Sequence, residues 1–200
     1  MKILVDTDKK IEEFEKFYNC PRSKIKKIPL LVKQDYTLDE KKISENVYKF
    51  GQKNKNYFFY PAQFWSHKNH IYILKTMHKL KQQNQVNVQF VFTGSEKGNG
   101  LLLKKKCKEL NIEDNVIFFD FLNDEDIVYL YLNSKGLVMP SLVGYSSIPL
   151  FEALSLNVPV FYTKNLLDSE LIPFVNEIDI YSLDNKDSLF NQINNYEKNI

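Results

Sequence analysis

Residues 137–160 read LVMPSLVGYSSIPLFEALSLNVPV and decide the fold class of this chain. An apolar run at the start predicts a buried strand, and a loop of small and hydroxyl residues at 143–147 follows it. A helix is then expected near Pro149, with Glu152 in its first turn, ahead of a second strand. Because a helix N-terminus has free N–H groups and partial positive charge, the loop suits the phosphates of a nucleotide diphosphate, with Glu152 accepting bonds from ribose hydroxyls. An ordinary βα unit, in which Ser147 caps the helix and Glu152 complements its dipole, explains the same spacing.

The segment resembles the nucleotide-sugar signature of retaining GT-B glycosyltransferases, especially the family 4 group. That signature reads P-S-x-x-E-G-x-G-x-P-x-x-E-A-x-A-x-G-x-P-V, and the matching residues here are Pro140, Ser141, Pro149, Glu152, Ala153, Pro159 and Val160. Two positions differ. Gly144 stands at the first glutamate of the family's E-x7-E pair, as it does in some members, and Asn157 replaces a glycine. The family's direct contact between that glutamate and the donor sugar is therefore not expected in this chain.

A second segment, PAQFWSHKNH at residues 61–70, follows an apolar run that predicts a strand. It resembles the family's G-R-x-x-x-x-K-N loop, whose basic residues hold the donor diphosphate. Lys68 and Asn69 fall on the family's lysine and asparagine, whereas Ala62 and Gln63 replace its glycine and arginine. Read without the resemblance, a lone lysine at a strand-to-helix junction is an ordinary solvated charge. With two matching loops in one chain, we interpret Lys68 as a phosphate ligand.

A third match lies between these two. Residues 90–94, FVFTG, predict a strand that ends in glycine, and a lysine-rich helix at 101–110 and a strand at 115–119 follow. In the family, the backbone just after this last strand holds the nucleobase, which points here to Phe121 and Leu122. Asp120 replaces the glycine that is common there.

The resemblance implies a site whose parts can be named. The residues expected to contact the donor are Gln63, Asn69, Gly94, Phe121, Leu122, Gly144, Ser146, Ser147 and Ile148, and the two assigned to catalysis are Lys68 and Glu152. Lys68 and the amides at 146–148 would stabilise the departing diphosphate without a metal. The chain has no D-x-D motif, and His67 and His70 have no third ligand at a suitable spacing, so we expect no metal and no cofactor.

Composition excludes several other classes of protein. A formal net charge of +2 is too balanced to predict a nucleic-acid partner. The two cysteines are far apart, which favours free thiols in a reducing compartment over a disulfide framework. No stretch approaches the length of a membrane helix. Lysine clusters at 24–27 and 104–106 indicate solvated faces, with peripheral contact to anionic lipid as the alternative. We therefore expect a cytoplasmic protein, with the inner membrane face as the alternative location.

Strand and helix patterns alternate along the chain and predict an α/β fold, a Rossmann-like parallel sheet with helices on both faces. We assign 1–35 to the end of an acceptor domain and its connection, and 36–200 to the C-terminal, nucleotide-sugar-binding half of a GT-B enzyme. Strands are expected at 3–5, 25–28, 57–60, 88–93, 115–119, 137–139, 158–161 and 178–181, and helices at 8–18, 38–50 (closed by Gly51), 68–83, 101–110, 124–133, 149–156 and 186–198. All three candidate loops follow strands, so they should meet at one edge of the sheet.

The function implied is transfer of a sugar from a nucleotide diphosphate sugar to an acceptor hydroxyl, with retention, in polysaccharide or glycoconjugate assembly. GT-B enzymes need an acceptor domain that this chain lacks, so the chain alone is expected to be inactive and to need an N-terminal domain for its glycan or lipid-linked acceptor. Two alternatives remain at this point. One is a noncatalytic nucleotide-binding or interaction module of the same fold, and the other is a GT-B-like nucleotide-sugar epimerase.

Overall fold

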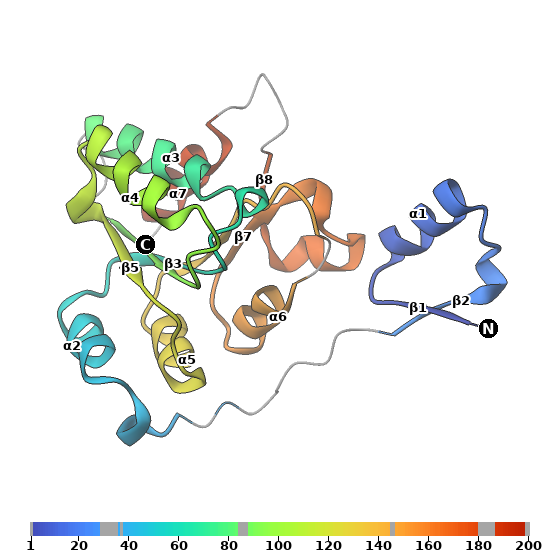
Figure 1. The fold of residues 1–200 in the computed structure, drawn as a ribbon, viewed down its shortest axis with the longest axis horizontal. Helices are drawn as coiled ribbons and strands as arrows, with labels where there is room; N and C mark the ends of the chain where they lie inside the picture. The colour runs from blue at the N-terminus through green and yellow to red at the C-terminus, as the bar shows by residue number, and fades with distance from the viewer. Residues whose placement is uncertain are drawn as a thin grey trace.

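A six-stranded, fully parallel sheet forms the centre of the computed structural model (Figure 1). The structure describes residues 2–28, 36, 38–83, 88–144, 147–179 and 187–198. The strands lie in the order β5-β4-β3-β6-β7-β8. Their bounds are β3 Tyr57–Pro61, β4 Gln89–Thr93, β5 Val116–Phe119, β6 Gly136–Met139, β7 Val160–Thr163 and β8 Asn176–Ile178. The predicted Rossmann-like parallel sheet is confirmed.

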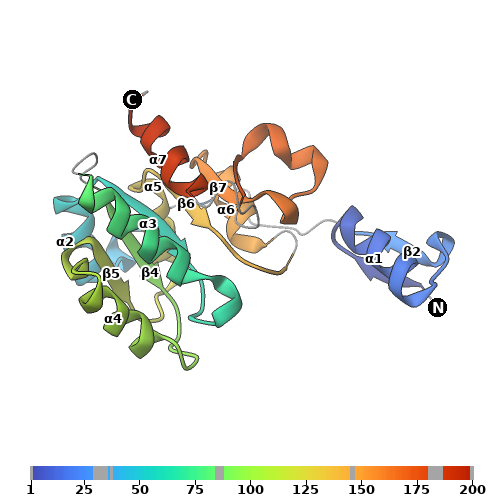
Figure 2. The same cartoon turned by 90° about the horizontal axis from the view of Figure 1, so that it is seen from above.

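Helices cover both faces of this sheet, as predicted (Figures 1 and 2). One face carries α3 (His70–Gln82), α4 (Gly100–Glu109) and α7 (Ser188–Lys198), and the other carries α2 (Glu45–Lys53), α5 (Asp124–Leu132) and α6 (Ile148–Ser155). Short 3-10 turns link them: η2 Glu40–Lys42, η3 Ser66–Lys68, η4 Glu113–Asn115, η5 Lys164–Leu166 and η6 Ser169–Phe174. Among the described residues, no helix has the length and apolar character needed to cross a bilayer.

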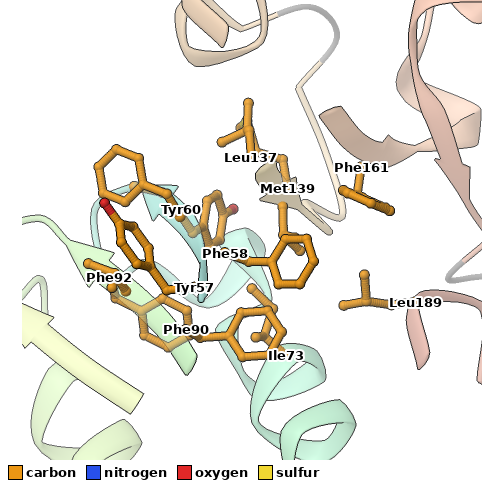
Figure 3. Close-up of a cluster of buried hydrophobic side chains, with 14 of the residues drawn as sticks. Tyr57, Phe58, Tyr60, Ile73, Phe90, Phe92, Leu137, Met139, Phe161 and Leu189 are labelled. Atoms are coloured by element: carbon orange, nitrogen blue, oxygen red, sulfur yellow. The ribbon is translucent and has the colours of Figure 1, made fainter. Parts of the chain in front are cut away.

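Aromatic side chains form much of the core around the central strand, β3. Residues 57–60 of β3 are all completely buried. Phe58 stacks on Phe90 at 5.8 Å between ring centroids and meets Phe161 edge-on at 5.4 Å, which joins three strands (Figure 3). Such ring pairs add stability beyond the area that they bury. The loops that follow β3 and β6 therefore start from strands that are packed into this core.

A smaller unit precedes the main sheet. Strands β1 (Ile3–Val5) and β2 (Ile25–Lys27) pair in parallel, and α1 (Asp8–Tyr18) connects them, followed by the turn η1 (Arg22–Lys24). The Thr7 side chain caps α1 by accepting a hydrogen bond from the Lys10 amide at 3.2 Å. This βαβ unit matches the strands and helix predicted at the start of the chain, and it lies beside η5 and η6 (Figure 1). The domain boundary at residue 35 stays a prediction.

Two predicted elements were placed wrongly. The helix expected at 38–50 begins only at Glu45, after η2, and it continues through Gly51 to Lys53. Gly51 does not end the helix, because its role is to let α2 approach α5: a Cβ atom there would lie 2.4 Å from the Tyr129 ring. The edge strand expected at 178–181 is β8, which ends at Ile178, and residues 180–181 lie outside the described residues.

Candidate functional site

Three loops meet at the point, between β3 and β6, where the order in which strands are added to the sheet changes direction. Strands β4 and β5 extend from β3 on one side, and β7 and β8 extend from β6 on the other. In open parallel sheets, ligands bind outside the carboxyl ends of the strands at such a switch point. The loops at 62–69, 94–99 and 140–147 follow the adjacent strands β3, β4 and β6. The topology therefore brings together the three segments in which the candidate residues were found.

Hydrogen bonds join the first and third loops directly. The Leu142 amide donates to the His67 carbonyl at 2.8 Å, and the Asn69 side-chain amide donates to the Pro140 carbonyl at 3.0 Å. Asn69 has a left-handed backbone, with φ of 57°, a conformation that asparagine tolerates better than most residues. In this structure, then, Asn69 holds the two loops at a fixed spacing.

Tyr60 contacts the junction of the first and third loops from within the core. Its hydroxyl donates to the Lys68 carbonyl at 2.9 Å and lies 3.1 Å from the Ser141 hydroxyl. The ring is completely buried. A buried phenol needs such partners, because an unpaired hydroxyl in an apolar core costs about 1–3 kcal/mol. The backbone at Lys68 is thus held by a group that cannot move without leaving its own hydroxyl unpaired.

Gly94 permits the second loop to approach the first. A Cβ atom at Gly94 would lie 2.5 Å from the Ala62 carbonyl oxygen, closer than two such atoms can come. The Asn99 side chain then donates to the Phe64 carbonyl at 2.9 Å and to the Ser66 hydroxyl at 3.1 Å. Gly94 is needed here for close packing of backbone on backbone.

Lys68 carries a half-buried positive charge. Burial lowers the pKa of its ammonium, and the ammonium makes no ion pair or hydrogen bond with any residue that the structure describes. On the same loop, the Oε1 atom of Gln63 is buried and also lacks a partner within the described chain. Charged and polar groups left unsatisfied in this way are costly, and they are typical of sites that bind a ligand. An anion at Lys68 would offset the cost.

Helix α6 begins directly after the loop that follows β6. Ser147 occupies the N-cap position, but its hydroxyl points to the Met139 sulfur at 3.4 Å and caps no amide. The capping role considered for Ser147 from sequence is therefore not seen. Ile148, the first residue of the helix, is about half exposed, at 53%. Ser146 lies outside the described residues.

Glu152 lies in the second turn of α6, not in the first turn as predicted. The helix begins at Ile148, so Glu152 is in the second turn, and no acidic residue occupies the first. The dipole interpretation of this carboxylate loses its basis, because that effect is confined to the first turn. Instead, Glu152 accepts a hydrogen bond at 3.3 Å from the hydroxyl of Tyr131, a buried residue of α5 that also donates to the Pro149 carbonyl. Burial raises the pKa of Glu152, and the Tyr131 hydroxyl partly opposes the rise.

The positions expected to hold the nucleobase lie farther along the same edge. Phe121 and Leu122 follow β5, which β4 and β3 separate from β6. Phe121 is 80% exposed, so its ring offers a free aromatic face, whereas Leu122 packs against the core. The Thr93 hydroxyl donates to the Asp120 carbonyl at 2.5 Å and fixes the start of this loop.

The two histidines of the first loop do not form a metal site in the described part of the chain. His67 stacks beside Trp65, with ring centroids 5.3 Å apart. His70 is buried among the rings of Tyr60, Phe64 and Phe92, and burial lowers its pKa to about 3. It is a neutral core residue at the start of α3.

The sequence, compared with known families, matches the model for glycosyl transferases group 1 over residues 42–173, more than half of the chain. The chain belongs to this family. A search of curated protein sequences gives no match.

Solved glycosyltransferase structures share the fold of this family member. WaaG, a glycosyltransferase involved in lipopolysaccharide biosynthesis, has a TM-score of 0.77 at 19% identity and covers 98% of this chain. A glycosyltransferase from Rickettsia africae gives 0.76 at 19% identity over 98%, and Anabaena HepE in complex with UDP gives 0.78 at 15% over 99%. The chain spans only 53–54% of these three structures.

In this glycosyl transferases group 1 chain, the sequence located the loops but not every partner. Lys68, Asn69, Gly144 and Ser147 lie on two loops that hydrogen bonds connect, and Gly94 lies on the adjoining one. Phe121 and Leu122 follow β5, which β4 and β3 separate from β6 and its loop. Tyr131 was missed as a partner of Glu152, because only the packing of α5 beside α6 brings a tyrosine 21 residues away into contact.

Proposed function

We propose that this chain is the donor-binding half of a retaining glycosyltransferase that takes a sugar from a nucleotide diphosphate sugar. The observation that carries the proposal is the half-buried Lys68 ammonium, which lacks a counter-ion among the described residues. It lies on a loop at the switch point of the sheet that hydrogen bonds join to the loop leading into α6. A diphosphate supplies the negative charge that both groups favour. Membership in glycosyl transferases group 1 supports the same reaction class.

The roles of the site residues follow from transition-state chemistry. As the glycosidic bond to the diphosphate breaks, negative charge grows on the leaving oxygen. Lys68 and the amides of Ser147 and Ile148 are preorganised donors that would stabilise this charge, without a metal in our proposal. Glu152, held by Tyr131, would accept hydrogen bonds from the ribose hydroxyls, and the exposed ring of Phe121 would offer a face to the base.

The complete reaction needs a second domain for the acceptor. Catalysis depends on orienting both reactants, and the solved relatives are about twice as long as this chain. We therefore expect residues 1–200 to bind a nucleoside diphosphate but to transfer no sugar alone. We place the whole protein in the cytoplasm, acting on a glycan or lipid-linked acceptor in polysaccharide or glycoconjugate assembly, with peripheral membrane contact as an option.

Calorimetric titration of Lys68→Ala tests the proposal. HepE was solved with UDP and with UDP-glucose, so uridine nucleotides are the first probes, followed by guanosine, adenosine, cytidine and thymidine diphosphates. We expect the variant to lose about 1.5–3 kcal/mol of binding free energy, the usual value of a charge-assisted hydrogen bond. Lys75→Ala, on the exposed face of α3, is the matched control and should bind as the parent does.

Two results would reject this function. One is equal affinity of Lys68→Ala and parent for the best nucleotide. The other is a parent chain that binds none of the five diphosphates, which would leave an interaction module as the better description. Product formed from a donor without any acceptor would instead indicate an epimerase.

A further inference from the structure

Helix α4 exposes apolar and basic side chains together. The spacing of one exposed set places its members on a single side of the helix: Leu101, Lys104, Lys105 and Lys108. Leu101 is 75% exposed, and its neighbour Leu102 is 53% exposed. We call these five residues the α4 patch. It combines an apolar tip, in the first turn of the helix, with a basic stripe that runs along the following turns.

The acidic residues next to the α4 patch are already bound to other groups. The Glu96 carboxylate accepts a hydrogen bond at 3.2 Å from the Leu101 amide, at the end of the helix where the dipole favours negative charge. Glu109 pairs at 2.8 Å with Lys106, which is not part of the patch. No residue that the structure describes forms an ion pair with a lysine of the patch. The basic stripe therefore keeps its full positive charge.

The two helical layers of the main domain differ in charge, and the α4 patch lies on the basic one. Helices α3, α4 and α7 carry eight lysines and two glutamates, whereas α2, α5 and α6 carry two lysines and five acidic residues. Within the basic layer, α3 packs between α4 and α7, so α4 is an outer helix (Figure 2). An anionic surface would attract the layer that contains α4 and repel the opposite layer, which fixes the orientation of the domain.

The apolar tip of the patch lies at the edge of the sheet that holds the candidate site. Helix α4 begins directly after the loop at 94–99, the second of the three site loops. Asn99, the N-cap residue of α4, bonds to the Phe64 carbonyl and the Ser66 hydroxyl of the first loop. Leu101 and Leu102 therefore follow a residue that is fixed to the site, and a surface that holds them would also hold the site close to it.

We propose that the α4 patch is a docking surface for an anionic lipid bilayer. The lysines lie at the level of the charged headgroups, where each contributes about 1 kcal/mol, a factor of about five in affinity. The two leucines enter the boundary between headgroups and acyl chains. This pairing of exposed leucine with lysine favours lipid over nucleic acid, because phosphates of a nucleic acid would use the lysines but not the leucines.

The contact itself needs no nucleotide. Only its use, which is to bring the donor site to a lipid-linked acceptor at the membrane, rests on the proposed function. Vesicle binding and nucleotide binding are measured separately, so one can fail while the other holds.

The test is co-sedimentation of the full 200-residue chain with vesicles. One set is pure phosphatidylcholine, and the other contains phosphatidylcholine and phosphatidylserine in equal amounts. The parent should bind the anionic set more tightly and should lose that preference at about 1 M salt, where charges are screened beyond about 3 Å. Combining Lys104→Gln, Lys105→Gln and Lys108→Gln should weaken binding to the anionic vesicles by about a hundredfold. Leu101→Ser should weaken it by about tenfold.

Matched controls remove the same groups from the opposite layer. Lys49→Gln, Lys53→Gln and Lys55→Gln together remove three exposed charges in and after α2, and Leu132→Ser removes a leucine of α5 that is 48% exposed. Both controls should bind vesicles as the parent does. All variants should keep the parent's nucleotide affinity and thermal midpoint, because the changed side chains lie on the surface.

Three results would overturn the proposal. One is a parent that binds neither vesicle type, or both equally. A second is an equal loss in the α2 control, which would show that overall charge rather than the α4 patch drives binding. The third is Leu101→Ser binding as the parent does, which would leave a polyanion such as RNA as the partner of the lysines.

Discussion

At the level of single residues, the site holds two ionisable groups whose burial favours their neutral forms. Burial lowers the pKa of Lys68 and raises the pKa of Glu152. In the free protein both shifts oppose the charged states, which costs stability. Groups held in this way are typical of binding and catalytic sites, where a ligand supplies the missing partners.

Glu152→Gln is predicted to separate stability from binding. Since the folded pKa is raised, the folded protein holds this proton more tightly than the unfolded chain does, and stability falls as pH rises from the ordinary pKa through the raised one. Glutamine removes that loss, so the thermal midpoint at neutral pH should equal or exceed the parent's. Melts across about pH 4 to 8 should show a flatter profile in the variant.

The same variant should bind ribonucleotides less well. We expect about tenfold weaker binding of the ribonucleoside diphosphate, with no change for the 2′,3′-dideoxy form, which lacks the hydroxyls that Glu152 would bind. In the parent, the ribose-dependent part of the affinity should disappear as pH falls through the raised pKa. Equal losses for both nucleotides in Glu152→Gln would rule out the ribose contact.

At the level of elements, Gly51 shows where close packing depends on a missing side chain. Gly51→Ala places a Cβ atom 2.4 Å from the Tyr129 ring and should destabilise the fold by about 1–3 kcal/mol, the usual cost of overpacking. Urea unfolding measures the loss. If α2 does pack this tightly on α5, the double variant Gly51→Ala with Tyr129→Leu should be more stable than the sum of the two single changes implies. Additive effects would contradict the packing.

Sequence patterns predicted the elements well for a physical reason. Strands β3, β4, β6 and β7 are apolar runs that are almost completely buried, so their position depends on local composition. Gly51 was misread because a glycine that ends a helix and one that admits a neighbouring ring look alike in sequence. The Tyr131–Glu152 bond comes from a contact between distant segments, which no local pattern encodes.

At the level of the whole molecule, Lys27 joins the small unit to the main domain. Bonds to Asp8 and Glu170 hold the pKa of Lys27 well above its ordinary value, so it remains charged at any physiological pH. Lys27→Met leaves Asp168, only 5% exposed, without its cation and should destabilise the chain. Adding Asp168→Asn should recover part of that loss in a thermal melt. A double variant no more stable than Lys27→Met would show that the ion pairs of Lys27 do not stabilise the contact between the small unit and the main domain.

The central claim, that nucleotide binds at the junction of β3 and β6, can be tested residue by residue. Titration of the ¹⁵N-labelled chain with its best-binding nucleoside diphosphate, followed by amide chemical shifts, locates the ligand directly. We predict the largest shifts at Lys68, Asn69, Gly94, Ser147 and Ile148, with smaller ones at Phe121 and Leu122. Saturable shifts that instead cluster away from these loops would contradict the site.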